Sequence, residues 1–315
     1  KVYYIFWGRN MELNDMLERK LTPEQKVKFE RDNGRFKLLK NIIILPIIVG
    51  IVGIYFESIL IVTICILCII LLLTLNIFSI NKKGKTYENV IVPYVLKEKF
   101  QNIEYNNNNK IRLEKIGDSK IFLDYDKIFC SNYFKILSGK YDIEVCKIIT
   151  KKMNIEENDG VVDKSLDENF CGIFAIVNIP TKFDNEFRVV KNIKEKEQIN
   201  NVNKAETQLV RMNNIEFDRI YDVYSMNQVS IKRVLSPGVM ARVLEINKKI
   251  GNIISFSIYN NVLYVAIEYN DYMEFKGKGK LYVDEDLARQ NLDMLESLEY
   301  FVRYIINITD SLNNV

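Results

Sequence analysis

Histidine is absent from this chain of 315 residues, and its absence is the most restrictive fact of the composition. Without histidine there is no imidazole general base, no Ser-His or Cys-His nucleophile pair and no histidine-ligated metal ion. The sequence therefore excludes much familiar enzyme chemistry, and it predicts no catalytic residue, no metal site and no cofactor.

Cysteines are few, and the five that are present form an odd and widely spaced set. Cys65 and Cys68 lie in an apolar segment, while Cys130, Cys146 and Cys171 stand singly along the rest of the chain. Such a set does not make a disulfide framework. The Cys-x-x-Cys spacing is that of a redox motif, but a reactive thiolate needs water and a lowered pKa. Small apolar side chains at a helix contact are the favoured interpretation.

An excess of charge of either sign is also lacking. The chain has 44 Lys and Arg residues and 41 Asp and Glu residues, for a net charge of +3. This balance does not produce the basic surface of a nucleic-acid-binding protein, so we expect no nucleic-acid partner. A Gly-x-x-x-x-Gly-Lys-Ser/Thr loop is missing as well, and the basic turn at residues 276–280 lacks the strand-loop-helix setting of a phosphate-binding loop.

The most prominent feature that is present is an apolar block at residues 38–80, in which Lys40 and Glu57 are the only charged residues. One helix of this length would far exceed the roughly 20 residues that cross a bilayer. A break around Glu57 leaves two segments of plausible length, residues 39–56 and 59–80. The block therefore predicts a hairpin of two transmembrane helices. Glu57 then lies in a turn at the headgroup level or, as the alternative, acts as a buried proton carrier.

Basic residues flank this block on both sides. They are Arg35, Lys37 and Lys40 before or at its start and Lys82, Lys83 and Lys85 after it. Positive charge stays on the cytoplasmic side of a membrane, so we expect a multi-pass protein of the cell membrane with both termini in the cytoplasm. The predicted organisation is a cytoplasmic helical segment at residues 1–37, the hairpin at residues 38–80 and a cytoplasmic domain at residues 86–315.

The third part carries alternating strand patterns between helical ones. Strands are predicted at residues 141–150, 170–180, 187–191, 206–212, 253–259 and 262–269. The second and third of these are expected to form a hairpin around Asp184 and Asn185. The last two are joined by Asn260 and Asn261, a pair able to take the positive dihedral angles of a tight turn. The prediction is an α+β domain with a mostly antiparallel sheet and flanking helices.

Two helices of this domain have clear boundaries or periodicity. Ser236 and Pro237 are expected to begin a helix that ends at Gly251. A long C-terminal helix is predicted at residues 285–312, with an apolar stripe formed by Leu295, Leu298, Val302, Ile305, Ile308 and Leu312. Packing on the sheet of the same chain is favoured, because only about three heptads are available for a coiled coil. A homo-oligomer formed through this helix or through the membrane spans is the alternative.

Two short motifs carry a resemblance to a known family. The first contains Phe217, Tyr221, Val223, Tyr224, Ser225 and Gln228, and the second contains Leu235, Ser236, Pro237, Met240 and Leu244. Together with the strand pair that follows, they resemble the DUF3137 family of uncharacterised bacterial membrane proteins. The resemblance covers roughly residues 12–275 and implies an amphipathic lead, paired membrane spans and a cytoplasmic domain without an assigned activity. Asn227 stands at a usually acidic position, which weakens any chemical role for an acid there.

The motif residues have a structural interpretation and a functional one. In the structural interpretation, which is favoured, the aromatic residues pack in a core and Ser236 and Pro237 begin a helix. In the functional interpretation, Tyr224, Gln228 and Arg233 line a groove for a polar ligand, because phenol, amide and guanidinium groups bind polar molecules.

Three functions are compatible with this sequence. The favoured one is a membrane-anchored cytoplasmic binding or scaffolding module with a protein partner, because the hairpin has no polar pathway. A membrane-bound enzyme would use carboxylates such as Asp124, Asp126 or Asp142, although no spacing marks a catalytic or metal-binding pair. An oligomeric pore or transporter subunit would need several copies, and no charged residue inside the spans marks an ion route.

Overall fold

A computed structural model of the chain describes residues 22–24, 27, 31, 41–42, 44–55, 59–100, 102–106, 110–138, 140–158, 161–192, 208–269 and 285–313. The chain divides into two compact units. The first consists of Lys1–Leu96 and Phe275–Ala288, and the second consists of Lys97–Glu274 and Arg289–Val315.

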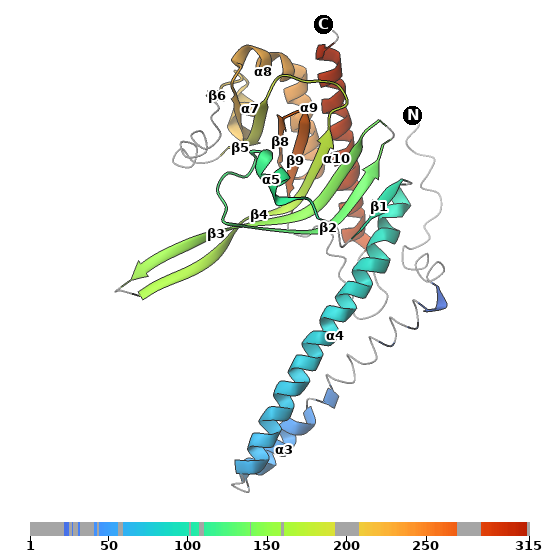
Figure 1. Cartoon of the computed structure of the whole chain (residues 1–315), viewed down its shortest axis with the longest axis vertical. Helices are drawn as coiled ribbons and strands as arrows, with labels where there is room; N and C mark the ends of the chain where they lie inside the picture. Colours follow the sequence, from blue (N-terminus) through green and yellow to red (C-terminus); the bar gives the residue numbers. More distant parts are fainter. Residues whose placement is uncertain are drawn as a thin grey trace. The chain divides into compact units, whose positions relative to one another are not determined.

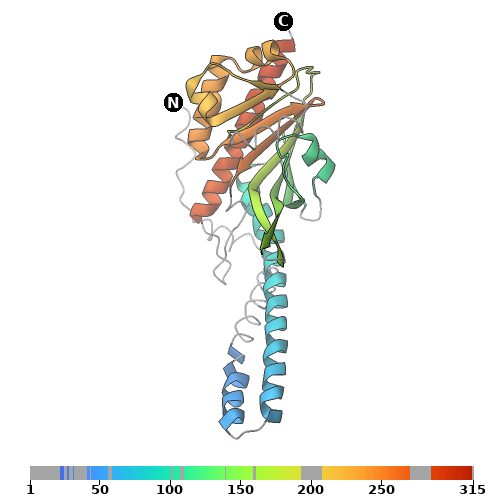
Figure 2. The same ribbon diagram turned by 90° about the vertical axis from the view of Figure 1, so that its left-hand side faces the viewer.

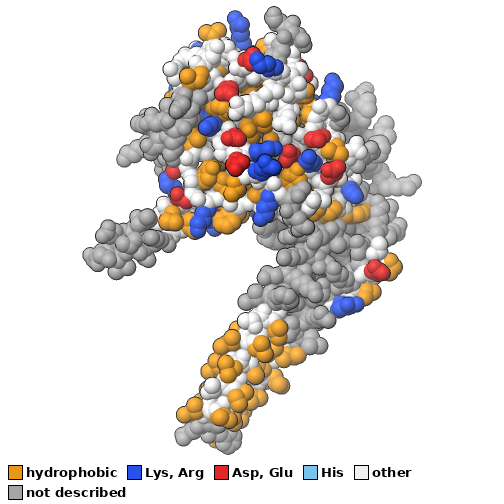
Figure 3. All heavy atoms as spheres, viewed as in Figure 1, with side chains coloured by type: hydrophobic (Ala, Val, Ile, Leu, Met, Phe, Trp, Pro, Cys, Tyr) orange, Lys and Arg blue, Asp and Glu red, His pale blue; other side chains and the backbone are white. Residues whose placement is uncertain are grey.

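The described part of the first unit contains helix α3 (Ile44–Tyr55) and most of helix α4 (Ile59–Lys99). The two helices approach closely at Gly50, where an added Cβ would lie 3.5 Å from the Cβ of Cys65. Cys65 is accordingly buried and Cys68 is exposed, so the first of these cysteines lies at a helix contact, as the sequence indicates. Among the described residues, exposed Ile, Leu and Val side chains lie along α3 and the first part of α4 (Figure 3).

The predicted transmembrane hairpin is wrong. Within the residues that the structure describes, no helix combines the length and the apolar character needed to cross a membrane. Helix α3 has 12 residues, or about 18 Å at 1.5 Å per residue, against about 30 Å for the hydrocarbon core. Helix α4 has 41 residues, but it does not stay apolar over its length, because it continues past residue 80 into the basic stretch with Lys82, Lys83 and Lys85. The predicted multi-pass location in the cell membrane conflicts with the same finding.

The second unit is built on one antiparallel sheet of nine strands (Figure 1). In chain order they are β1 (Ile103–Tyr105), β2 (Lys127–Leu137), β3 (Asp142–Asn158), β4 (Val161–Asn178), β5 (Phe187–Lys191), β6 (Gln208–Val210), β7 (Tyr221–Ser225), β8 (Ile254–Tyr259) and β9 (Val262–Glu268). Their order across the sheet is β1-β2-β3-β4-β9-β8-β5-β7-β6. The α+β part of the predicted fold class is therefore confirmed.

Helices cover both faces of this sheet. They are α5 (Leu113–Asp118), α7 (Ile215–Ile220), α8 (Gln228–Val234), α9 (Pro237–Ile250) and α10 (Glu285–Asn313). On one face, Ile116 of α5 joins a buried cluster that includes Phe174 and Tyr264, whose rings stack with centroids 6.2 Å apart. On the other face, Phe301 of α10 meets Phe256 of β8 edge to face at 5.1 Å. Figure 2 shows α10 running along its face of the sheet.

Several local predictions for this unit are confirmed. Asn260 and Asn261 have φ angles of 50° and 62° and join β8 to β9, as a tight hairpin turn requires. Helix α9 begins at Pro237 and ends before Gly251, whose φ of 77° closes the helix in the left-handed conformation. Most of the apolar stripe of α10 is buried, with Leu295, Leu298 and Val302 fully inaccessible, so this helix packs on the sheet of its own chain.

The predicted hairpin around Asp184 and Asn185 is wrong. Strand β4 pairs with β3 and β9, whereas β5 pairs with β7 and β8. The segment between β4 and β5 is instead held by Asn261, which accepts a hydrogen bond from the Phe183 backbone N–H at 2.8 Å and donates one to the Ile179 carbonyl at 2.8 Å. The segment between β4 and β5 is thus positioned by Asn261, a residue that lies far from it in the sequence.

Candidate functional site

The three residues predicted to line a polar groove lie in different surroundings. Tyr224 lies in β7 and is completely buried. Gln228 begins α8 at the surface, where its amide donates to the side chain of Gln208 at 3.4 Å, and Arg233 is exposed near the end of the same helix. The described contacts do not join the three side chains, and the polar groove stays a prediction.

Tyr224 instead contacts a buried arginine. Arg188 of β5 is directly opposite Tyr224 of β7 on one side and Ser257 of β8 on the other. Its side chain is 1% exposed, and its guanidinium carbon lies 4.0 Å from the centre of the Tyr224 ring. A cation over an aromatic face in a desolvated site is worth about 2 kcal/mol. The sequence indicates nothing special at Arg188, because one charged residue in a short strand is normally exposed.

The loop after α5 covers this arginine. Arg188 donates through Nη1 to the carbonyl of Lys120 at 3.0 Å, and Ser257 donates through Oγ to the carbonyl of Ser119 at 2.5 Å. Burial lowers the pKa of Arg188, while Tyr259, Tyr224 and Asp222 act against that shift. An arginine stays charged in proteins even so. The arrangement is a buried cation that holds the loop onto the sheet.

Two tyrosine hydroxyl groups lie beside this cation. The Oη atoms of Tyr224 and Tyr259 are buried and have no hydrogen-bond partner among the described residues. Burial raises the pKa of Tyr259 to about 12 and also raises the pKa of Tyr224. Both phenols are therefore neutral at pH 7, and neither is suited to act as a base. The cluster of Arg188, Tyr224 and Tyr259 is therefore suited to a structural role and not to catalysis.

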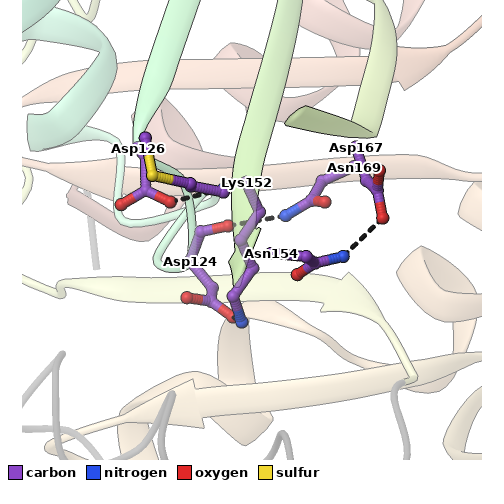
Figure 4. Close-up of polar contacts among 7 residues, drawn as sticks. Asp124, Asp126, Lys152, Asn154, Asp167 and Asn169 are labelled. Atoms are coloured by element: carbon purple, nitrogen blue, oxygen red, sulfur yellow. Dashed lines mark hydrogen bonds and ion pairs between the residues drawn. The ribbon is translucent and has the colours of Figure 1, made fainter. Parts of the chain in front are cut away.

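The carboxylates considered for an enzyme lie at the surface. Asp124 forms an ion pair with Lys152 of β3, and Asp126 accepts a hydrogen bond from the backbone N–H of Met153 at 2.7 Å. Figure 4 shows these side chains beside β3. Asp142, at the start of β3, is also exposed. Asp124 and Asp126 attach the loop before β2 to the neighbouring strand β3.

Further polar contacts join β4 to this loop and to β3. Asn169 of β4 donates to the carbonyl of Asp124 at 2.8 Å, and Asn154 of β3 hydrogen-bonds Asp167 of β4 (Figure 4). No group of three or more potential metal ligands occurs in the described part of the chain. Asp124 and Asp126 therefore have structural partners, and the described contacts do not distinguish a catalytic pair.

An open groove that no sequence pattern predicts lies between α7, α9 and the start of β8. Its volume is about 280 Å³, and its lining is Glu216, Ile220, Leu244, Asn247, Lys248, Gly251, Asn252 and Ile253. The left-handed turn at Gly251 ends α9 and leads the chain into β8. This turn forms one end of the groove. The sequence signals for this turn were recognised, but the packing of α7 against α9 depends on contacts that periodicity does not reveal.

The floor of the groove is held in place by Asn247, which is only 8% exposed. Its amide nitrogen donates to the hydroxyl of Tyr221 at 2.6 Å, and its amide oxygen accepts from the backbone N–H of Ile254 at 3.1 Å. Asn247 therefore connects α9 to β7 and β8 with both ends of its side chain. The shape of the groove is therefore fixed by hydrogen bonds between α9 and the sheet.

The rim of the groove carries one charge of each sign. Lys248 and Glu216 form an ion pair at 3.3 Å, and their side chains are 76% and 61% exposed. An exposed pair of this kind contributes roughly 0–1 kcal/mol to stability. Its charges are consequently available to a ligand without a large loss of folding energy. Apolar walls with a few polar groups at the edge are typical of binding sites.

Comparisons with known proteins identify one family. Residues 168–313 match the family model described as "Protein of unknown function (DUF3137)". The resemblance to this family is thus confirmed for residues 168–313, which include both motifs and α10. The part of the chain before residue 168, to which the resemblance was expected to extend, lies outside the match. No curated protein and no solved structure matches the chain.

Proposed function

We propose, taking the DUF3137 match over residues 168–313 as the premise, that this protein is a binding or scaffolding module and that the groove between α7 and α9 receives an apolar side chain of a protein partner. The whole groove lies inside the matched region. The observation that carries the proposal is a preformed hollow with apolar walls and an exposed ion pair at its rim.

The size of the groove favours a protein partner over a cofactor. Pockets that enclose drug-sized ligands have volumes of about 300–1,000 Å³ and bury most of the ligand. This groove is open and has a volume of about 280 Å³, which is room for one large side chain and part of its backbone. Side chains anchored in small pockets carry much of the energy of protein interfaces.

The two charged side chains at the rim would fix the orientation of the bound partner. Lys248 of α9 and Glu216 of α7 come from different helices and pair with one another at the rim. A partner with an acidic residue on one side of its apolar anchor and a basic residue on the other would match them. Charge complementarity of this kind contributes chiefly to specificity and association rate.

A pair of matched tryptophan variants tests the proposal. Ile220→Trp fills the groove from its wall, whereas Ile215→Trp places the same residue at a position of α7 that is 82% exposed. We expect the intact protein, used as bait for affinity capture and mass spectrometry, to retain its partner with Ile215→Trp and to lose it with Ile220→Trp. Circular dichroism of both variants establishes that they are folded.

Charge reversal at the rim gives a second measurement on the same partner. With the captured partner purified, we expect Lys248→Glu to weaken binding about tenfold, which corresponds to about 1.4 kcal/mol. The double variant Glu216→Lys, Lys248→Glu restores the ion pair with opposite polarity and is expected to remain weak. A partner that binds Ile220→Trp and Lys248→Glu as tightly as the unchanged protein would rule out the groove as its site.

A further inference from the structure

Cys130 and Cys146 lie on neighbouring strands of the sheet beside a β-bulge. Cys130 of β2 is opposite Ile148 of β3, so Cys146, two residues from Ile148, is its diagonal neighbour on the same face. The register shifts immediately after this point, where Asn132 takes a φ of 53°. A bulge bends its strand and changes the direction of nearby side chains, and Cys130 and Cys146, both free thiols, lie next to this one.

The two thiols differ in exposure. Cys146 is completely buried in the apolar cluster under α5, whereas Cys130 packs against the edge of that cluster and is partly accessible. Cys130 is therefore partly accessible to a small reagent from solvent, and Cys146 is not.

The surroundings favour ionisation of the accessible thiol. A hydrogen bond from the Cys146 thiol, a backbone hydrogen bond from Ile111 and the charge of Lys110 lower the pKa of Cys130 to about 7, against the opposing effect of burial. Burial raises the pKa of Cys146 well above its usual value. A thiolate beside a protonated second thiol is the arrangement found in redox-sensing cysteine pairs.

We propose that Cys130 and Cys146 form a peroxide-reactive dithiol, in which Cys130 is oxidised first and Cys146 then closes a reversible disulfide between β2 and β3. This modification site is separate from the groove between α7 and α9. It does not depend on the proposed binding function.

The reaction is balanced with hydrogen peroxide as the oxidant. The Cys130 thiolate attacks one peroxide oxygen, the O–O bond breaks, and hydroxide leaves while the sulfur becomes a sulfenic acid. The sulfur of Cys146 then attacks the sulfenic sulfur, and the S–S bond forms as the S–O bond breaks. The departing hydroxyl group and the proton of Cys146 form water. A thiol reductant returns both cysteines to thiols by exchange.

Peptide mapping of the full-length protein tests the proposal directly. Trypsin cleaves after lysine and releases residues 128–135 and 141–147, each with one cysteine. After treatment with hydrogen peroxide and blocking of free thiols, we expect these two peptides to be joined and lighter by two hydrogen atoms than their sum. Dithiothreitol should separate them. Absence of the joined peptides at peroxide doses that oxidise Cys130 would overturn the proposal.

Single variants distinguish the two roles. Cys146→Ser should leave a sulfenic acid on Cys130 that a cyclic dione reagent traps, whereas Cys130→Ser should prevent oxidation of Cys146. Cys171→Ser, which changes another buried cysteine, should leave the joined peptides unchanged. Equal trapping at Cys146 in the Cys130→Ser variant would also overturn the order of events.

The rate of alkylation gives an independent readout without peroxide. At pH 7 we expect iodoacetamide to modify Cys130 about tenfold faster than an ordinary exposed thiol, because a larger fraction is thiolate. The rate should reach half of its maximum near the pKa of about 7. The groups that face the pair are Lys110, Tyr133 and Glu144. A half-maximal rate at the pH of an ordinary cysteine would contradict the proposed role of Cys130 as the first site of oxidation.

Discussion

Replacing Gly172 with alanine is expected to unfold the sheet of the second unit at a much lower urea concentration than the unchanged protein requires. An added Cβ would lie 2.1 Å from the carbonyl oxygen of Ile267 and 2.9 Å from the backbone nitrogen of Tyr269. Both are backbone atoms, and neither can rotate away. Strand β4 would have to move away from β9, at a cost of about 3 kcal/mol or more in the free energy of unfolding.

The expected loss of stability is large because Gly172 lies at the end of the central strand pair β4–β9. It is opposite Glu268 in the β4–β9 register, and the next hydrogen bond joins the Tyr269 N–H to the Cys171 carbonyl at 2.9 Å. Separation of the strands at this point removes that hydrogen bond and exposes part of the apolar core. Chemical unfolding followed by circular dichroism measures the effect, and hydrogen exchange of the β9 amides localises it.

Gly238→Ala is the matched control for this substitution. Nothing lies within 4 Å of a Cβ added at Gly238, which is near the start of α9. Alanine is the better helix former by about 1 kcal/mol, so the control is expected to leave stability unchanged or to raise it slightly. Equal unfolding midpoints for the two variants would show that the space around Gly172 adjusts at no cost.

Sequence patterns predicted the parts of this fold that depend on local chemistry. The turn at Asn260 and Asn261 follows from the tolerance of asparagine for positive φ angles, and α9 follows from Pro237 and Gly251 at its ends. The pairing of β4 and β5 was mispredicted, because Asp184 and Asn185 are equally typical of a loop between strands that are not paired. Strand pairing depends on residues that are distant in sequence: β4 pairs with β3 and with β9.

The apolar block was misinterpreted for a related reason. Composition indicated segments long enough to cross a bilayer, but composition alone does not determine where a helix begins and ends. The first helix with described residues in this region, α3, is shorter than the predicted span, and α4 runs far beyond its own. Of the flanking basic residues, Arg35, Lys37 and Lys40 lie outside the described residues.

The buried polar cluster could be anticipated only in part. The motif containing Tyr224 was correctly interpreted as core, because alternate residues of a strand face the same side. Nothing in the short strand around Arg188 indicated that its guanidinium would lie over that ring, since the contact depends on the register of β5 with β7. Charged residues are almost never fully buried unless they are paired, so sequence reasoning places such an arginine at the surface.

This burial makes Arg188→Ala the second substitution with a large expected effect. The variant leaves a cavity beside Tyr224 and removes the hydrogen bond to the Lys120 carbonyl. It also removes the cation that acts on Asp222, itself 1% exposed. Breaking a buried charged contact by removing one partner costs about 3–5 kcal/mol, and we expect a loss of about 3 kcal/mol in chemical unfolding.

Two further variants separate charge from volume at this position. Arg188→Met keeps most of the side-chain length without the charge, and a well-packed apolar replacement of a buried ion is often tolerated; we expect it to lose less stability than alanine. Tyr224→Phe keeps the ring under the guanidinium and removes a hydroxyl that has no hydrogen-bond partner among the described residues, so stability should be unchanged or higher. If Arg188→Ala changed stability by less than about 0.5 kcal/mol, as a surface substitution does, the arginine would not hold the loop at residues 119–126 to the sheet.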